Sequence, residues 1–245
     1  MRKAFKEYTE PFRKYGDMMI FKINHAYRVS SLCGRLAQKT GLTKEEVKLL
    51  EEGGLLHDIG RFEQWKEYGD HQDAKTIDHG DYGVELLKKD NFIDKFTKNN
   101  HETIYTIVKY HNKYSVPSTL PDNIKTYLDI VRDADKIDVL YAMVIDELVC
   151  DDNNKEITDV VMEQARNKVL IRNKDAKTPY DWIAVNLAFI FDLKIKESFN
   201  VVKENDYHNK IIDKYMNKTS NKETQKQLEE LRELVNNYIE ERLTC

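Results

Sequence analysis

Cysteine is scarce in this sequence, and the few cysteines are scattered. The three residues, Cys33, Cys150 and Cys245, form no closely spaced pair. An odd number of widely spaced cysteines does not indicate a domain stabilised by disulfide bonds, and it is typical of proteins in a reducing compartment. We therefore expect a cytoplasmic protein.

Long hydrophobic runs are also missing. The longest apolar stretch, residues 182–191, is about half as long as a membrane-spanning helix and is interrupted by Asn186. Near the N-terminus, residues 18–23 are too few for a signal peptide, and Lys22 breaks them. Both features predict a soluble chain without a membrane span or a secretory leader.

An excess of positive charge is absent too. The chain has 39 Lys and Arg against 43 Asp and Glu, a formal net charge of −4. Such a balance gives no strong attraction to a nucleic acid backbone, so we expect no nucleic acid polymer as a partner. With 245 residues and 40% hydrophobic residues, the chain can build one large domain or two small ones around an ordinary core.

Apolar residues recur at three- and four-residue spacing along almost the whole chain, and no internal repeat or persuasive strand is present. The sequence therefore predicts an all-α fold. Thr43 and Glu46 have the spacing of a capping box, which opens a helix that runs to His57 and Asp58. The other expected helices cover residues 5–15, 24–39, 79–89, 100–111, 122–149 and 224–243, with three or four more in residues 156–217.

Two polar segments interrupt this pattern. Residues 62–78 are charged and carry one aromatic pair, so we expect a long lid or binding loop there. Residues 151–154 predict a linker between a core of residues 1–150 and a helical extension of residues 151–245 packed on that core. The last helix has near-heptad spacing, which favours packing on its own domain and leaves a homodimer contact as the minor alternative.

His57 and Asp58 are adjacent and lie among large aliphatic residues. A buried carboxylate needs a metal ion, a cation or several hydrogen bonds, so the pair predicts either a stabilising hydrogen bond or a metal site. Further side chains of the ligating kind stand elsewhere in the sequence, namely His25, His79, His111 and Asp135. Six such nitrogen and oxygen donors would fill most of the coordination of two divalent ions.

This arrangement resembles the HD-domain superfamily of metal-dependent phosphohydrolases. The match consists of the lone His25, the pair His57 and Asp58 inside His-Asp-Ile-Gly-Arg, and the distant Asp135. It extends over about residues 20–150.

Two further histidines, His79 and His111, look like those of the two-metal branch, which includes the HD-GYP phosphodiesterases. No Gly-Tyr-Pro segment follows His111. We therefore do not expect cyclic dinucleotide cleavage.

The resemblance implies two ions per chain, with Asp58 as the bridging and catalytic carboxylate. One ion would be held by His25, His57, Asp58 and Asp135, and the second by Asp58, His79 and His111. A metal pair about 3.5–4 Å apart lowers the pKa of a bridging water and clamps both oxygens of an in-line displacement at phosphorus. The implied activity is hydrolysis of a small phosphoester, a nucleotide or related metabolite, as a monoester or a diester. Manganese, iron, cobalt, nickel and zinc all suit these ligands.

Charge developing on phosphoryl oxygens needs cations nearby. Arg61 is the best catalytic candidate, because it follows His57 by four residues and shares its face if the helix continues. Arg28, Lys113 and Arg132 are weaker candidates for binding substrate.

Two other functions fit the same donors. Some HD-fold proteins resemble this set but hold two irons and activate dioxygen, so a di-iron oxygenase stays open. A non-catalytic nucleotide-binding module that keeps its metal for structure stays open as well.

Overall fold

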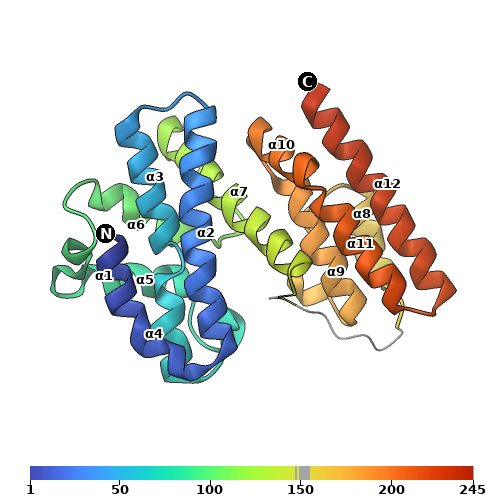
Figure 1. Ribbon diagram of the computed structural model, residues 1–245, viewed down its shortest axis with the longest axis horizontal. Coiled ribbons are helices and arrows are strands. Elements are labelled where there is room, and N and C mark those ends of the chain that lie inside the picture. Colours follow the sequence, from blue (N-terminus) through green and yellow to red (C-terminus); the bar gives the residue numbers. More distant parts are fainter. Residues whose placement is uncertain (147, 149–154, 245) are drawn as a thin grey trace. The chain divides into compact units, whose positions relative to one another are not determined.

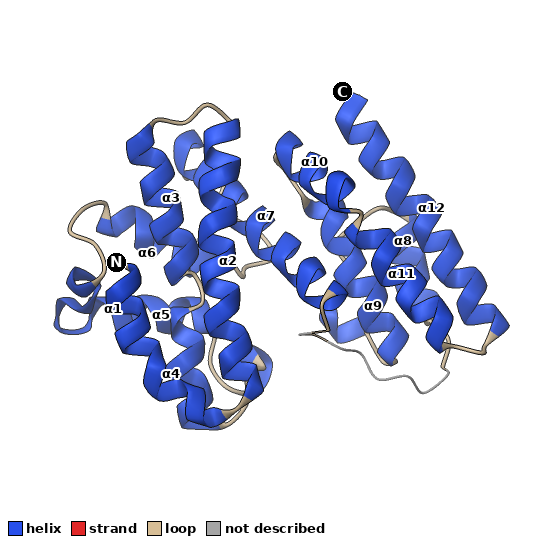
Figure 2. Cartoon of the chain, in the orientation of Figure 1, coloured by secondary structure: helices blue, strands red, loops and turns tan. Residues whose placement is uncertain are grey.

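The structure is a computed structural model that describes residues 1–146, 148 and 155–244. The described residues form helices, turns and loops, with no strand among them, which confirms the all-α prediction (Figure 2). The chain divides into two compact units, Met1–Asp135 and Lys136–Cys245. The expected linker lies outside the described residues, whereas this division falls inside a helix, so the domain limits given above stay a prediction.

The first unit is a set of helices connected by short segments (Figure 1). Helix α2 packs against α3, α4 against α5, and α5 against α6. The bounds are α1 (Arg2–Thr9), α2 (Asp17–Lys39), α3 (Lys44–Leu56), α4 (Ile59–Tyr68), α5 (His79–Lys88), α6 (His101–Tyr110) and α7 (Asp122–Val144), of which α7 continues into the second unit. Short 3-10 helices lie at Glu10–Tyr15, Asp73–Lys75 and Lys89–Lys95.

Helix α2 begins seven residues before the expected start at residue 24, so that expectation was wrong. Met19, Phe21 and Ile23 are buried and extend the apolar side of the helix toward its N-terminus. The capping box of Thr43 and Glu46 is confirmed, since each side chain accepts from the other residue's backbone amide. The α7 helix is described to Val144, and its expected end at residue 149 lies outside the described residues.

The long loop expected at residues 62–78 is also wrong in its first half. Helix α4 continues to Tyr68, and Gly69 ends it in a left-handed conformation with φ of 66°. Ile59 and Phe62 are fully buried, one turn apart, while the charged residues between Phe62 and Tyr68 lie on the outer side of the helix or at its edge. The connecting segment is therefore limited to residues 69–78.

Aromatic rings fix the N-terminal helix on α4. The ring of Phe62 lies 5.4–6.1 Å, centroid to centroid, from those of Tyr8 and Phe12, and 6.0 Å from that of Phe5. The single helix expected over residues 5–15 is interrupted, because α1 ends at Thr9 and Pro11 lies in the following 3-10 helix.

The second unit contains α8 (Asp159–Arg166), α9 (Pro179–Leu187), α10 (Lys196–Asn205), α11 (Tyr207–Lys218) and α12 (Lys222–Thr244), with 3-10 helices at Asn173–Asp175 and Ala188–Asp192. Helix α12 buries Leu228, Leu231, Val235 and Ile239 and packs against α10 and α11 of the same unit. The homodimer contact through α12 stays a prediction.

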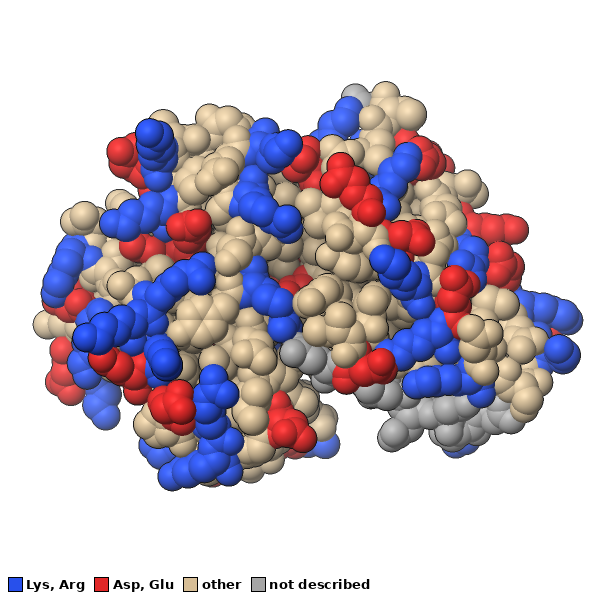
Figure 3. All heavy atoms as spheres, viewed as in Figure 1, with Lys and Arg blue, Asp and Glu red and all other residues tan. Residues whose placement is uncertain are grey.

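No helix among the described residues is long and apolar enough to cross a membrane. On the face shown in Figure 3, lysine and arginine side chains are interspersed with aspartate and glutamate. That face therefore carries no broad field of a single sign.

Helices α4 and α5 approach each other too closely for a side chain at Gly60. A Cβ atom there would lie 2.2 Å from the carbonyl oxygen of His79 and 2.8 Å from the amide nitrogen of Gly83. Because both atoms belong to backbone, Gly60→Ala must push the helices apart. We expect a loss of about 1–3 kcal/mol in the free energy of unfolding, measured by urea denaturation, although alanine favours a helix by about 1 kcal/mol.

Gly53→Ala is the matched control, since its Cβ would meet the flexible end of the Ile107 side chain at 2.8 Å. Equal stability of the two variants would contradict the proposed backbone clash at Gly60.

The second unit contains a buried histidine, His208, whose protonation would oppose folding. Its Nε2 lies 2.8 Å from Asn236 Oδ1, and its Nδ1 is buried without a partner among the described residues. Burial lowers the pKa of His208, so the folded state favours the neutral ring. The contribution to stability is complete above about pH 6.5, the usual histidine pKa, and is lost as the pH falls below it.

We expect the wild-type second unit to lose stability between pH 7 and pH 5, and His208→Gln to lose less over that interval. Urea denaturation at each pH measures this, with His101→Gln in the first unit as the control. An unchanged pH slope in the His208 variant would exclude this group as the cause.

Candidate metal centre

The six expected ligands come from five places in the first unit. His25 lies inside α2, His57 and Asp58 form the turn between α3 and α4, His79 begins α5, His111 follows α6, and Asp135 lies in α7. His57 and Asp58 were expected within one helix, but α3 ends at Leu56 and α4 starts at Ile59. The turn lets both side chains point to the same place.

One group of donors surrounds the Nε2 atom of His25. This atom lies 3.2 Å from His57 Nε2 and 3.0 Å from Asp135 Oδ1. The carboxylate oxygen Oδ2 of Asp58 lies 3.8 Å from it and 3.7 Å from His57 Nε2. His25, His57 and Asp135 thus offer ligand atoms that lie within 4.8 Å of one another.

A second group meets the other oxygen of the same carboxylate. Asp58 Oδ1 lies 3.2 Å from His79 Nε2 and 3.5 Å from His111 Nε2, and these two nitrogens are 3.0 Å apart. The two oxygens of Asp58 therefore face different pairs of imidazoles. This is the geometry that a bridging carboxylate needs.

The opposite nitrogens of three rings are already engaged. His57 Nδ1 lies 2.7 Å from the carbonyl oxygen of Gly54, and His111 Nδ1 lies 2.8 Å from that of Val108. Since a carbonyl only accepts, each Nδ1 carries a proton, and Nε2 is the nitrogen left to bind a metal ion. His79 is oriented in the same way: its Nδ1 lies 2.6 Å from Asp73 Oδ2, and its Nε2 faces Asp58.

Lone pairs and carboxylate oxygens that converge in this way repel one another unless a cation lies between them. Ligand atoms bound about 2.0–2.1 Å from one ion are separated by roughly 3–3.4 Å. The spacings in both groups, from 3.0 to 3.8 Å, are close to that range. The residues present therefore fit divalent metal ions.

A buried His–Asp pair that serves stability alone fits less well. His57 Nε2 and Asp58 Oδ2 are 3.7 Å apart, too far for a hydrogen bond, and the ring proton of His57 goes to Gly54.

The pKa shifts agree with ligation. Burial raises the pKa of the Asp58 carboxyl, but the Lys22 ammonium and the His57 ring beside it outweigh burial and hold that pKa well below its usual range. Burial lowers the pKa of His111 to about 4. At neutral pH the carboxylate is charged and this imidazole is neutral, which are the forms that bind metal.

Sequence reasoning missed Lys22. Its Nζ lies 2.7 Å from Asp58 Oδ2, and the side chain is only 16% exposed. Lys22 precedes His25 by three residues on α2, so helical spacing already places the two side chains on one face.

Asp73 was missed as well. Its Oδ2 contacts His79, and its Oδ1 lies 2.7 Å from Arg61 Nη1. Asp73 lies in the segment between α4 and α5, where no helical period places a side chain, so the sequence offered no signal for it.

Arg61 reaches the expected carboxylate but has other partners. Its Nε lies 3.6 Å from Asp58 Oδ1, whereas its Nη1 donates to Asp73 Oδ1, to Gln64 Oε1 and to the carbonyl oxygen of His71. Its action on phosphoryl oxygens stays a prediction.

The three expected substrate-binding cations are engaged elsewhere. Lys113 Nζ lies 2.7 Å from Asp78 Oδ1 and 2.6 Å from Asp81 Oδ2. Arg132 Nη1 donates to backbone carbonyls at the end of α6, among them that of His111 at 3.2 Å. The Arg28 guanidinium lies 6.0 Å from the Phe21 ring centroid. Their binding of substrate stays a prediction.

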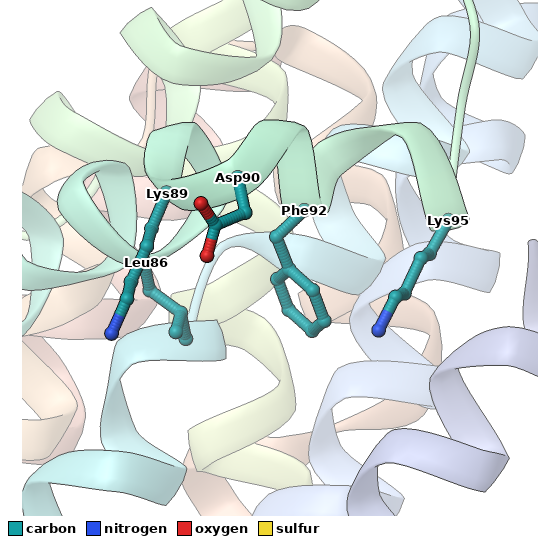
Figure 4. A pocket seen from close by; sticks show the side chains of 5 residues that line it. All are labelled: Leu86, Lys89, Asp90, Phe92 and Lys95. Atoms are coloured by element: carbon teal, nitrogen blue, oxygen red, sulfur yellow. The ribbon is translucent and has the colours of Figure 1, made fainter.

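A shallow hollow elsewhere in the first unit shares none of the six ligand residues. It is lined by Leu86, Lys89, Asp90, Phe92 and Lys95, and the Phe92 ring lies between the lysine side chains (Figure 4). The Lys95 ammonium lies 4.8 Å from the centroid of that ring. The hollow is therefore separate from the metal centre.

A family model described as the HD domain matches residues 23–140, which include all six expected ligands. This region of the chain belongs to the HD-domain superfamily. This superfamily comprises metal-dependent phosphohydrolases whose members bind divalent metals, so the prediction of the family is confirmed.

Over 97 residues the HD-domain protein is 30% identical to ribonuclease Y of Lawsonia intracellularis (strain PHE/MN1-00). The aligned part is 40% of this chain but only 15% of the relative's length. No solved structure matches the chain.

Asp58 serves both donor groups, whereas Asp135 serves one. We expect Asp58→Asn to reduce retention of all bound metal, and Asp135→Asn to reduce only the part held with His25 and His57. Elemental analysis of the purified variants, with circular dichroism to check helix content, measures this. Equal metal content in Asp58→Asn and wild type would exclude the bridging role.

Proposed function

We propose that this HD-domain protein hydrolyses a small phosphoester, a nucleotide or related metabolite, with two divalent ions held at the candidate metal centre. The observation that supports this proposal best is that the two carboxylate oxygens of Asp58 face separate pairs of imidazoles. Bound divalent ions would lower the pKa of water and neutralise charge on phosphoryl oxygens.

The ligand rings are held in the orientation that this chemistry needs. The backbone carbonyls of Gly54 and Val108 fix the protons of His57 and His111 at Nδ1, so their Nε2 atoms need no rearrangement. A preorganised site of this kind stabilises charge without moving at the moment of reaction.

Lys22 is the cation that we assign to the substrate. Among the described residues its ammonium has one carboxylate partner, Asp58, and it is mostly shielded from water. A lysine on a flexible stem can exchange an aspartate oxygen for a phosphoryl oxygen without breaking a bidentate contact.

Two other activities must be distinguished experimentally from hydrolysis of a small phosphoester. The name of the similar ribonuclease Y makes an RNA phosphodiester a substrate class to test. The formal net charge of −4 argues against a polymer as substrate. The same ligands also suit a di-iron oxygenase, which oxygen uptake by iron-loaded protein would reveal.

The decisive experiment is a phosphoester panel in the presence of Mn²⁺: p-nitrophenyl phosphate, bis-p-nitrophenyl phosphate, nucleoside mono-, di- and triphosphates, and an RNA oligonucleotide. We expect turnover of a small phosphoester. Lys22→Met should raise KM by roughly 10–100-fold, because a charge-assisted contact is worth about 1.5–3 kcal/mol. Metal content should be retained.

Lys14→Met, an exposed lysine of the same unit, is the matched control and should behave as wild type. Absence of turnover across the panel in protein that holds its metal would refute the proposed function. Turnover of RNA alone would replace the small phosphoester by a polymer.

A further inference from the structure

Asp73 connects the segment between α4 and α5 to the metal centre. Its Oδ2 lies 2.6 Å from His79 Nδ1, and its Oδ1 lies 2.7 Å from Arg61 Nη1 and 3.0 Å from Gln64 Nε2. The two oxygens of one carboxylate thus contact a ligand histidine on one side and helix α4 on the other.

The need for such a group follows from where each histidine stands. The Nδ1 atoms of His57 and His111 both bind the carbonyl oxygen three residues earlier, which their own helices supply. His79 is the first residue of α5, so the carbonyl three residues before it belongs to Thr76, in a non-helical conformation with φ of −127° and ψ of −107°. A side chain from the preceding segment must therefore orient this ring.

Asp73 is itself held in place. Gln64 is fully buried on α4, and its Nε2 also donates to Thr76 Oγ1 and to the carbonyl oxygen of Ile77, both at 2.8 Å. The guanidinium of Arg61 adds its contacts to Asp73 and to the carbonyl oxygen of His71. Residues 71–77 are thus tied to α4 by two side chains.

We propose that Asp73 is a positioning residue for His79 and makes one half of the metal centre depend on the segment at residues 69–78. The ion shared by Asp58, His79 and His111 requires this segment in place, whereas the ion shared by His25, His57 and Asp135 does not. Arg61 acts in this arrangement as the anchor of Asp73. The inference rests on the proposed two-ion centre.

Partners of the outer nitrogen of a ligating histidine typically change metal affinity by about 10–100-fold. We therefore expect Asp73→Ala to bind one Mn²⁺ with wild-type affinity and the other 10–100-fold more weakly. Titration of the metal-free protein, followed by the electron paramagnetic resonance signal of free Mn²⁺, measures both steps. Asp73→Asn, which keeps an acceptor oxygen, should fall between Asp73→Ala and wild type.

Asp70→Ala is the matched control. Asp70 lies in the same segment, and its Oδ1 accepts from the backbone amide of Gln72 rather than from a ligand histidine. This variant should bind two ions as the wild type does, and His79→Ala should reproduce the loss seen in Asp73→Ala.

The inference would be overturned if Asp73→Ala bound both Mn²⁺ ions with wild-type affinity, or if it bound both ions equally more weakly. It would also be overturned if the wild type bound a single Mn²⁺. If Asp73→Ala does not fold, as judged by circular dichroism, the same criteria apply to Asp73→Asn. Binding is measured without substrate, so a wild type that binds two ions but turns over no phosphoester would refute the function and leave this inference intact.

Discussion

The first unit depends on keeping four imidazole nitrogens and two carboxylates within a few ångströms of one another. His25 Nε2 and His57 Nε2 are 3.2 Å apart, and His79 Nε2 and His111 Nε2 are 3.0 Å apart. Such contacts are costly in a metal-free protein. Three of the four rings are fixed through their Nδ1 atoms, by backbone carbonyls at His57 and His111 and by Asp73 at His79. A cation between the donors would turn their repulsion into attraction.

Close helix packing is the other condition, since the six expected ligands lie in several different helices or directly beside their ends. At Gly54 a Cβ atom would lie 2.7 Å from Cys33 Sγ and 3.2 Å from the Cα of Ser30, so α2 and α3 approach closely beside His57. Gly60 allows the same approach of α4 to the start of α5, beside His79. We expect a side chain at either crossing to displace the neighbouring expected ligand, and metal sites tolerate displacements of only about 0.5 Å.

Helical period was sufficient for the all-α fold, because it is a local property. Residue chemistry together with the resemblance to the HD-domain superfamily brought the six donors into one hypothesis. Sequence reasoning failed for helix α4, whose buried residues Ile59 and Phe62 precede a charged outer face that resembles a loop. It also missed Asp73, whose role exists only after the segment at residues 69–78 folds back on α4. Tertiary contacts, which spacing cannot reveal, decided both.

The two cations nearest Asp58 illustrate why residue type alone does not assign a role. The planar fork of Arg61 is committed to Asp73, Gln64 and a backbone carbonyl, and moving it would release the segment that orients His79. Lys22 is a point charge that contacts one carboxylate in the described part of the chain, so it can move at less cost. Two divalent ions would outweigh the charges of Asp58 and Asp135, and the ammonium would then be repelled from the carboxylate that it contacts. An anionic phosphoester offers it a new partner, and for this reason Lys22, rather than the arginine expected from spacing, is the cation best suited to meet the substrate.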